Sequence, residues 1–259
     1  MKNIAIITAK GGNRSLKNKN IRKICGKPSI YYPITAAQEA DHVDEVFVTT
    51  ECSLIKEVCL TYGAKVIDRP KELAQPYSNI GDVILHASKA AQKIMDEKIL
   101  TVTILLGNTV MLTEDDINNC IEKTISDEII DSCMTVWKAE DDHPYRAMVI
   151  DQNGYLASYK KGNTPDTNRQ SYPEVFYYDQ GPWTVRMTSL LKSEKTREGP
   201  AAWWWMGKNC AAIERLWVTG RDTHTQYDID IAEWWLKKYR FTGVKNPPNA
   251  ESCPDEFDR

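Results

Sequence analysis

The spacing of hydrophobic residues in the first half of the chain alternates between two periods. Short runs rich in β-branched residues, typical of buried strands, occur at 4–7, 45–50, 65–68 and 101–106. Hydrophobic positions recurring every three or four residues predict helices at 29–40, 54–62 and 79–96. Strands that alternate with helices over short connections form a parallel sheet with helices on both faces. We therefore predict an α/β fold.

The pattern changes after about residue 132. Three runs separated by turn residues are typical of antiparallel hairpins, and they span 133–137, 147–150 and 155–159. Residues 161–174 are polar, so we expect a long loop, and loops of this length are often functional. A last helix is predicted at 231–239. The acidic, proline-containing stretch after Asn246 predicts a poorly packed tail.

A loop dense in basic residues follows the first predicted strand. Gly11 and Gly12 let the backbone turn tightly and approach a ligand. The basic residues around them are Lys10, Arg14, Lys17, Lys19 and Arg22. This charge predicts a bound anion, with phosphate as the simplest choice. The spacing matches neither the Walker A loop nor the dinucleotide fingerprint, and an ordinary solvated basic turn is the alternative.

The composition limits the class of partner. With 259 residues, 42% of them hydrophobic, the chain suits one soluble domain with an excursion. Its 33 Lys and Arg are outnumbered by 36 Asp and Glu, so we expect a small anion and no nucleic acid. No hydrophobic run reaches about 18 residues and no signal-peptide core follows Met1, which predicts a cytoplasmic protein without membrane contact.

Cysteine and histidine positions do not indicate a metal site. The seven cysteines include no Cys-x-x-Cys pair, and the four histidines show no metal-binding spacing. We interpret the cysteines as reduced thiols and the histidines as structural. The acids at 114–116 follow Thr113 in the pattern of a helix capping box, so we interpret this cluster as structural too.

Several motifs together resemble one enzyme family. The basic loop reads Thr8-Ala-Lys-Gly-Gly-Asn-Arg-Ser-Leu-Lys-Asn-Lys-Asn-Ile21. Further matching segments, in order, are 26–28, 48–51, 69–74, 82–87, 168–170, 177–178 and 228–230. In order and spacing they resemble the acylneuraminate cytidylyltransferases, which activate sialic acids and related nonulosonic acids with CTP, and more distantly the enzymes that activate Kdo. The resemblance covers nearly the whole chain.

The resemblance implies a fold and a reaction. It implies a Rossmann-like three-layer nucleotidyltransferase domain over 1–245 with a mostly parallel sheet. Within it, 138–187 would be an inserted hairpin region for dimerisation and acceptor binding, and 246–259 a loosely packed tail. The implied enzyme transfers CMP from CTP to a small acidic sugar with release of pyrophosphate, uses Mg2+ and forms a homodimer.

The resemblance also assigns residues to the nucleotide and the metal. Nucleotide binding is implied for Lys10, Gly11, Gly12, Asn13, Arg14, Lys19, Asn20, Arg69 and Asn108. Asp228 and Asp230 would hold Mg2+, and with Lys10 and Lys19 they form the implied catalytic set. In an extended segment, carboxylates two residues apart can face one cation. The alternative is a cap on the last helix, and both roles can coexist.

The acceptor side combines family residues with departures from the family. Arg169, Gln170 and Tyr178 would bind the acceptor, with the Arg169 guanidinium on its carboxylate. Leu106 replaces a family glutamine, Lys10 replaces an arginine, and a family Gly-Ala-Ile-Tyr strand becomes Gly181-Pro-Trp-Thr184.

Two questions stay open at this point. The tryptophans at 203–205 are either core or subunit interface, or part of an acceptor pocket changed for a less hydroxylated substrate. The alternatives for function are the same chemistry on Kdo, an amino-Kdo or a phosphonate, and a nucleotide-binding paralogue without turnover.

Overall fold

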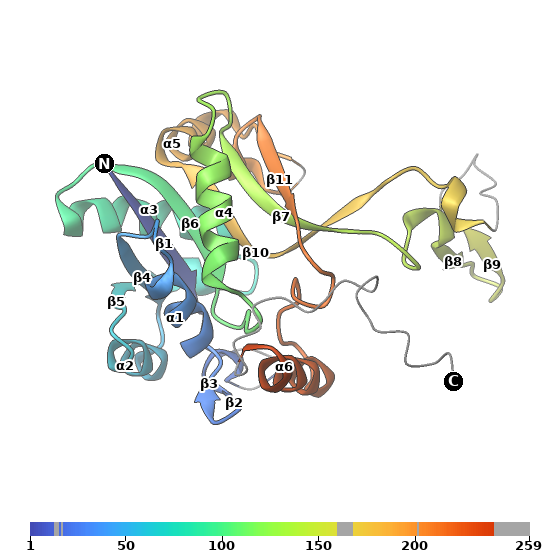
Figure 1. Ribbon diagram of the computed structural model, residues 1–259, viewed down its shortest axis with the longest axis horizontal. Coiled ribbons are helices and arrows are strands. Elements are labelled where there is room, and N and C mark those ends of the chain that lie inside the picture. The colour runs from blue at the N-terminus through green and yellow to red at the C-terminus, as the bar shows by residue number, and fades with distance from the viewer. Residues whose placement is uncertain (13–15, 17, 160–167, 201, 241–259) are drawn as a thin grey trace, which may run out of the picture.

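The computed structural model describes residues 1–12, 16, 18–159, 168–200 and 202–240, with Arg169 described by its backbone alone. Its central strands are β1 (Lys2–Thr8), β4 (Glu45–Thr50), β5 (Lys65–Asp68), β6 (Ile99–Leu106), β7 (Ser132–Lys138), β10 (Phe176–Arg186) and β11 (Cys210–Glu214). They form one seven-stranded sheet in the order β11-β7-β10-β6-β1-β4-β5 (Figure 1). β10 runs antiparallel to both of its neighbours, and the other pairs are parallel.

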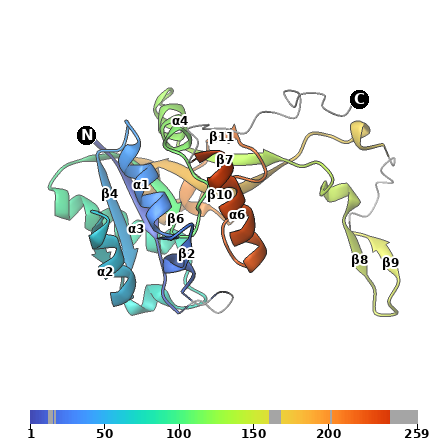
Figure 2. The same ribbon diagram turned by 60° about the horizontal axis from the view of Figure 1, so that its bottom comes forward.

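Helices cover both faces of this sheet (Figures 1 and 2). They are α1 (Tyr31–Glu39), α2 (Ser53–Thr61), α3 (Ile80–Met95), α4 (Glu114–Ile125), α5 (Met187–Thr196) and α6 (Gln226–Lys238). Successive side chains of a strand point to opposite faces. Accordingly, Ile6 of β1 packs in a core with α3 and α5, whereas Ile7 packs in a second core with α1, α2 and α4. The predicted three-layer α/β fold is confirmed.

The helix α6 packs at the carboxyl edge of the sheet rather than on a face. Its buried residues Ile229 and Trp235 form a third core cluster with Ile24, Tyr32 and Met111. Ile24 lies in the short strand β2 (Lys23–Ile24), which pairs with β3 (Lys27–Pro28). Tyr32 lies in α1, and Met111 lies in the segment after β6. α6 therefore closes the side of the molecule where the loops after β1 and β6 meet.

Elements with a clear local pattern lie close to where the sequence placed them. The predicted strand at 65–68 is β5, and the predicted helix at 79–96 is α3, capped by the Asn79 side chain. Thr113 and Asp116 form the predicted capping box of α4. No range was predicted for α5 or β11. The last helix begins at Gln226 and not at 231.

The tryptophan segment belongs mainly to the core, which confirms that interpretation for Trp204 and Trp205. Both rings pack against Gly81 at the start of α3, where an added Cβ would lie 2.6 Å from Trp204. Trp203 is the exception. Its ring centroid lies 4.0 Å from that of Tyr178.

Between β7 and β10 the chain leaves the sheet and forms an arm, described at residues 139–159 and 168–175, that projects from the body (Figures 1 and 2). The arm carries β8 (Met148–Ile150) and β9 (Leu156–Ser158), which pair antiparallel as predicted. It also carries the 3-10 turns Pro144–Arg146 and Arg169–Ser171. Large hydrophobic side chains are exposed on this hairpin, including Ile150 and Leu156.

Two further observations concern the described residues as a whole. None of their helices combines the length and the hydrophobicity needed to cross a membrane. Their cysteines, at positions 25, 52, 59, 120, 133 and 210, are free thiols. The predicted tail at 246–259 lies outside the described residues.

Candidate functional site

A small cavity, the nucleotide cavity, opens at the carboxyl ends of β1 and β6. Its volume is about 220 Å³. Its polar lining consists of Thr8, Lys10, Lys19, Asn20, Arg69, Gln75, Ser78, Asn108 and Asp222. Open α/β sheets bind ligands outside the carboxyl ends of their strands, so the cavity lies where such a site is expected.

Lys19 and Arg69 bring positive charge into the nucleotide cavity. Arg69 is only 7% exposed, and its Nη2 donates a hydrogen bond to the carbonyl oxygen of Thr49 at 2.7 Å. Burial lowers the pKa of Arg69, and Glu51, 4.0 Å away, opposes this effect. Burial also lowers the pKa of Lys19, against the attraction of Asp222. Partly dehydrated cations of this kind interact strongly with an anion.

The loop after β1 is held at its base. The Asn20 side chain is buried and donates to the carbonyl oxygen of Lys10 at 2.8 Å. Gly11 donates its N–H to Glu51 at 2.8 Å, and a Cβ at Gly11 would lie 2.9 Å from Cys52. Gly12 has a φ of +63°, which favours glycine. Of the other predicted nucleotide-binding residues, Asn13 and Arg14 lie outside the described residues.

Asp222 connects the nucleotide cavity to a second, larger cavity. Its Oδ2 accepts a hydrogen bond from Asn108 at 2.9 Å and lies 2.8 Å from His224 Nε2 and 3.9 Å from Lys19 Nζ. Asn108 also donates to the carbonyl oxygen of Thr223 at 3.0 Å. These contacts tie the loop after β6 to the segment before α6. They fix the Asp222 carboxylate at the boundary of the two cavities.

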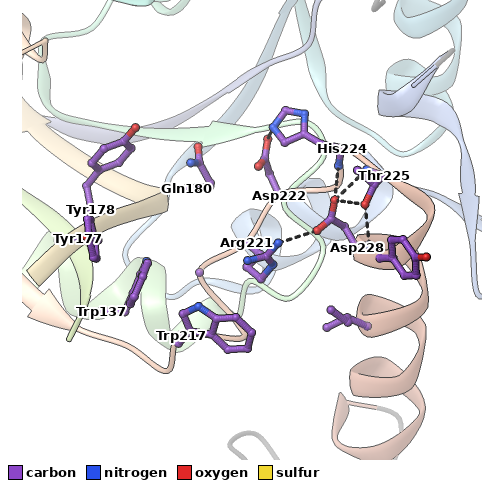
Figure 3. Close-up of a pocket in the computed structure, with 13 residues that line it drawn as sticks. Trp137, Tyr177, Tyr178, Gln180, Trp217, Arg221, Asp222, His224, Thr225 and Asp228 are labelled. Carbon is purple, nitrogen blue, oxygen red and sulfur yellow. Dashed lines mark hydrogen bonds and ion pairs between the residues drawn. The ribbon is translucent and has the colours of Figure 1, made fainter. Parts of the chain in front are cut away.

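The second cavity, the acceptor cavity, has a volume of about 590 Å³. Trp137, Tyr177 and Tyr178 gather on one side of it, and Asp222, His224 and Asp228 lie on the other (Figure 3). The remaining lining residues are Gln180, Trp217, Gly220, Arg221, Thr225, Tyr227 and Ile231. The cavity can therefore hold a molecule that is apolar along one edge and polar along the other.

The expectation that Asp228 and Asp230 lie in an extended segment is wrong, because both belong to α6. Residues two apart in a helix point to different sides. Asp228 is the third residue of a capping box with Thr225, so the alternative role as a helix cap is confirmed for it. Asp230 accepts a hydrogen bond from Gln226 near the surface and lines neither cavity.

Asp228 is fully engaged by its neighbours (Figure 3). Its Oδ2 accepts from the N–H groups of His224 and Thr225 and from the Thr225 hydroxyl, and its Oδ1 accepts from Arg221 at 2.9 Å. Burial alone would raise the pKa of Asp228, but these hydrogen bonds lower it to about 2. The described residues contain no group of three His, Cys, Asp or Glu side chains placed to hold a metal.

The predicted acceptor residues are divided between two places. Tyr178 lines the acceptor cavity. Gln170 lines a separate cavity of about 300 Å³ on the arm, beside His143 and Tyr172. The backbone of Arg169 begins a turn on the arm, and its side chain lies outside the description. Leu106, which replaces the family glutamine, lines the nucleotide cavity.

Sequence reasoning missed Asp222, His224 and Arg221. A signal was present, because Thr225-x-x-Asp228 has the spacing of a capping box and places the helix start at 226. The segment before it is then non-helical. In such a segment Asp222 and His224, two residues apart, can face the same side, as the structure shows them doing.

The parallel sheet and the cavity at its carboxyl edge define an α/β protein of the nucleotide-binding type. Residues 4–193 match the family model described as Cytidylyltransferase. Because this match covers more than half of the chain, the protein belongs to the cytidylyltransferase family of enzymes. The similarity inferred from the loop motifs is thereby confirmed.

Curated relatives extend this similarity. A post-translational flagellin modification protein B of Campylobacter coli is 25% identical over 91% of this chain and 95% of its own. A pseudaminic acid cytidylyltransferase of Campylobacter jejuni is 34% identical over 49% of this chain and 55% of its own. An N-acylneuraminate cytidylyltransferase of Streptococcus agalactiae is 37% identical over 32% of this chain and 21% of its own.

Among solved structures, a CMP:2-keto-3-deoxy-manno-octonic acid synthetase complexed with CTP is similar to this chain. The TM-score is 0.68, with 15% sequence identity, over 92% of this chain and 99% of the other. At this identity the match supports the fold alone. It confirms the three-layer α/β fold with a mostly parallel sheet that the sequence predicted.

Proposed function

We propose that the protein transfers CMP from CTP to an acidic sugar and releases pyrophosphate. The observation that carries this proposal is the meeting of two cavities at Asp222, one lined by Lys19 and Arg69 and one lined by aromatic and polar side chains. CTP would occupy the nucleotide cavity and the sugar the acceptor cavity. The α-phosphorus would then lie at their boundary, beside Asp222.

The reaction needs positioning and charge neutralisation. A hydroxyl oxygen of the acceptor forms a new bond to the α-phosphorus, the bond to the bridging oxygen of the β-phosphate breaks, and the hydroxyl proton is released. Lys10, Lys19 and Arg69 neutralise the triphosphate, while Asn20 and Gly11 fix the loop that carries Lys10 and Lys19. No covalent enzyme nucleophile is required.

Cytidylyltransferases typically use a divalent metal, and the Asp222 carboxylate is suited to bind one. Mg2+ is commonly bound through one or two carboxylates together with substrate phosphates and waters. The contacts of Asp222 with other described residues all involve Oδ2, which leaves Oδ1 for a cation. Bound Mg2+ would supply neutralisation of the phosphate charge. Metal binding by Asp228 and Asp230, implied by the family resemblance, stays a prediction. Substitution of each aspartate would compare its role with that of Asp222.

The aromatic edge of the acceptor cavity favours a nonulosonic acid over Kdo as acceptor. Trp137, Tyr177 and Tyr178 present ring faces and edges to the cavity, which suit methyl and acylamino groups better than hydroxyl groups. Sialic acid relatives carry such groups, and Kdo does not. The relatives named for pseudaminic acid and for flagellin modification support the same choice.

Pyrophosphate release tests the proposal directly. The protein would be assayed with each of CTP, UTP, ATP and GTP, with Mg2+, against pseudaminic acid, N-acetylneuraminate, Kdo, an amino-Kdo and a phosphonate. We expect turnover with CTP and a nonulosonic acid. Turnover with Kdo or the phosphonate alone would establish the alternative acceptors. CTP binding without turnover on any acceptor would contradict the proposal and establish a paralogue that only binds nucleotide.

We also propose that the arm forms a homodimer interface. Met148, Ile150 and Leu156 are 58%, 73% and 70% exposed on a hairpin that contributes nothing to the main core. A second copy of this chain would cover them. The family resemblance to dimeric enzymes, noted for the 138–187 region, supports this choice of partner.

A further inference from the structure

Arg221 is the one Lys or Arg residue among the described side chains that line the acceptor cavity. Its guanidinium carbon lies 5.3 Å from the ring centroid of Trp217, and its Nη2 donates to Asp228 Oδ1 at 2.9 Å (Figure 3). The side chain is 41% exposed, so it forms part of the cavity surface and is not sealed behind it. Asp228 and Trp217 hold the guanidinium in one orientation.

The Arg221 guanidinium has N–H donors without a partner among the described residues. Arginine carries five N–H donors in a rigid fork. Among the described residues, only Nη2 has a hydrogen-bond partner. Nε is buried from solvent and out of reach of a ligand, whereas Nη1 has no partner among these residues and is not buried. The N–H groups of Nη1 are therefore available to an acceptor atom of the substrate.

His224 is the other basic side chain of the acceptor cavity, and it already has a partner. His224 Nε2 lies 2.8 Å from Asp222 Oδ2, at the boundary with the nucleotide cavity. Gln180 and the tyrosines are uncharged. A carboxylate that enters the acceptor cavity therefore finds one planar cation in the described lining, and a guanidinium fork matches two carboxylate oxygens at once.

The backbone around Arg221 is fixed as well. A Cβ at Gly220 would lie 2.6 Å from the Cβ of Asp179, so this position admits only glycine without rearrangement. The Gly220 carbonyl oxygen accepts a hydrogen bond from Gln180 at 3.0 Å. Arg221 therefore starts from a backbone that is locked to β10, which carries Tyr177 and Tyr178 of the aromatic edge. Such preorganisation lowers the entropy cost of ligand binding.

We propose that Arg221 binds the carboxylate of the acceptor and thereby selects acidic sugars. The inference rests on the proposed function, since it concerns the same cavity. It adds a specificity residue from the segment before α6 to the Arg169 expected from the family resemblance. The carboxylate would bind at Nη1, while Nη2 keeps its hydrogen bond to Asp228.

Equilibrium binding tests this role without turnover. The full-length protein, saturated with CTP in the absence of divalent metal, would be titrated in a calorimeter with pseudaminic acid, N-acetylneuraminate and their carboxamides. Charge-assisted hydrogen bonds contribute about 1.5–3 kcal/mol, so we expect the acid to bind about ten- to a hundredfold more tightly than its amide. Arg221→Gln should lower this preference about tenfold or more, with the acid weakened and the amide unchanged.

Two further variants separate binding from support of the fold. Arg221→Lys keeps the positive charge but lacks the planar guanidinium, so it should retain part of the preference for the acid. If Arg221→Gln unfolds, Arg221→Lys is compared with the wild type in its place. Asp228→Asn removes the negative charge beside Arg221 but leaves an oxygen that can accept from Nη2, so it should keep the preference. The proposal fails if Arg221→Gln keeps the full wild-type preference for the acid, if Asp228→Asn loses as much of the preference as Arg221→Gln does, or if the wild type binds no acid more tightly than its amide.

Pyrophosphate release by the wild type, with Mg2+ present, is read separately. Turnover combined with an unchanged acid preference in Arg221→Gln would contradict the role of Arg221 and leave the proposed function intact. A preference that depends on Arg221, without turnover on any acceptor, would contradict the proposed function and support the role of Arg221.

Discussion

At the scale of single residues, two aspartates near α6 have different environments. Among the described residues, Asp222 makes contacts through one oxygen and borders both cavities. Asp228, in contrast, accepts four hydrogen bonds from Arg221, His224 and Thr225. A carboxylate whose oxygens are already occupied is a poor candidate for a metal ligand. The structure therefore separates a catalytic candidate from a structural acid that lies nearby in sequence.

Substitution of Asp222 tests its proposed role. Asp222→Asn should lower kcat by about 10²–10³-fold, since it removes a charged group beside the reacting phosphate. The fold should be retained, because an asparagine oxygen can still accept from Asn108. The measurement is pyrophosphate release over a range of Mg2+ concentrations. Unchanged turnover would exclude Asp222 as a metal ligand and leave Asp228 and Asp230 as the candidate ligands.

Lys19 offers a second residue-scale prediction. Lys19→Met keeps the length of the side chain and removes its charge from the nucleotide cavity. Loss of a charge-assisted contact to phosphate, about 1.5–3 kcal/mol, should weaken CTP binding about ten- to a hundredfold in a calorimetric titration. Lys23→Met is the matched control, because Lys23 is exposed and lines neither cavity. Equal effects of the two variants would show that only the overall charge matters.

At the scale of elements, the start of α6 depends on an ionised Asp228. Hydrogen bonds lower its folded-state pKa to about 2, so its stabilisation is present above the ordinary carboxyl pKa and is lost as the pH falls toward 2. Asp228→Asn lacks this contribution. At neutral pH it should be less stable than the wild type by about 1–2 kcal/mol, the size of a lost helix cap.

Chemical denaturation at several pH values measures this difference. The gap in unfolding free energy between wild type and Asp228→Asn should be constant above about pH 5 and should shrink steadily toward pH 2. Asp230→Asn is the control, and should change stability by no more than about 0.5 kcal/mol because its side chain is exposed. A gap that does not vary with pH would show that Asp228 acts through shape alone.

Local patterns explain which elements could be predicted. β5 and α3 carry their signals within a few neighbouring residues, and the structure places both close to the expected ranges. β10 is different, because it is inserted antiparallel between β6 and β7, strands far from it in sequence. Pairings of that kind leave no periodic trace. The start of α6 could have been found from Thr225 and Asp228, whose spacing matches the capping box recognised at Thr113.

Some residues of the candidate site could be predicted from the sequence, and others could not. Lys19 and Arg69 were expected in one pocket from the family resemblance, and the structure brings them to the same cavity from segments after β1 and after β5. The sequence places Asp222 in the non-helical segment before α6 but does not show which residues it contacts. Its significance depends on contacts with Lys19 and Asn108, residues more than a hundred positions away along the chain.

At the scale of the whole molecule, the body and the arm differ in how they place their hydrophobic side chains. The body buries its core against both faces of the sheet, and the nucleotide and acceptor cavities meet at the carboxyl edge. The arm has too few residues to bury a core of its own, and its hairpin exposes Ile150 and Leu156. An isolated two-stranded hairpin is marginally stable in water, so the arm needs a partner surface.

Charge on the arm should therefore dissociate the protein. If a second copy covers Ile150 and Leu156, each buried side chain contributes about 1.5–3 kcal/mol, and Ile150→Asp with Leu156→Asp should raise the dimer Kd by at least about a hundredfold. Sedimentation over a range of concentrations measures this. Ile94→Asp, at an exposed position on α3, is the control and should leave the dimer intact. A wild-type chain that sediments as a monomer at every concentration would rule out the arm as a dimer interface, because the exposed hairpin would then remain uncovered in solution.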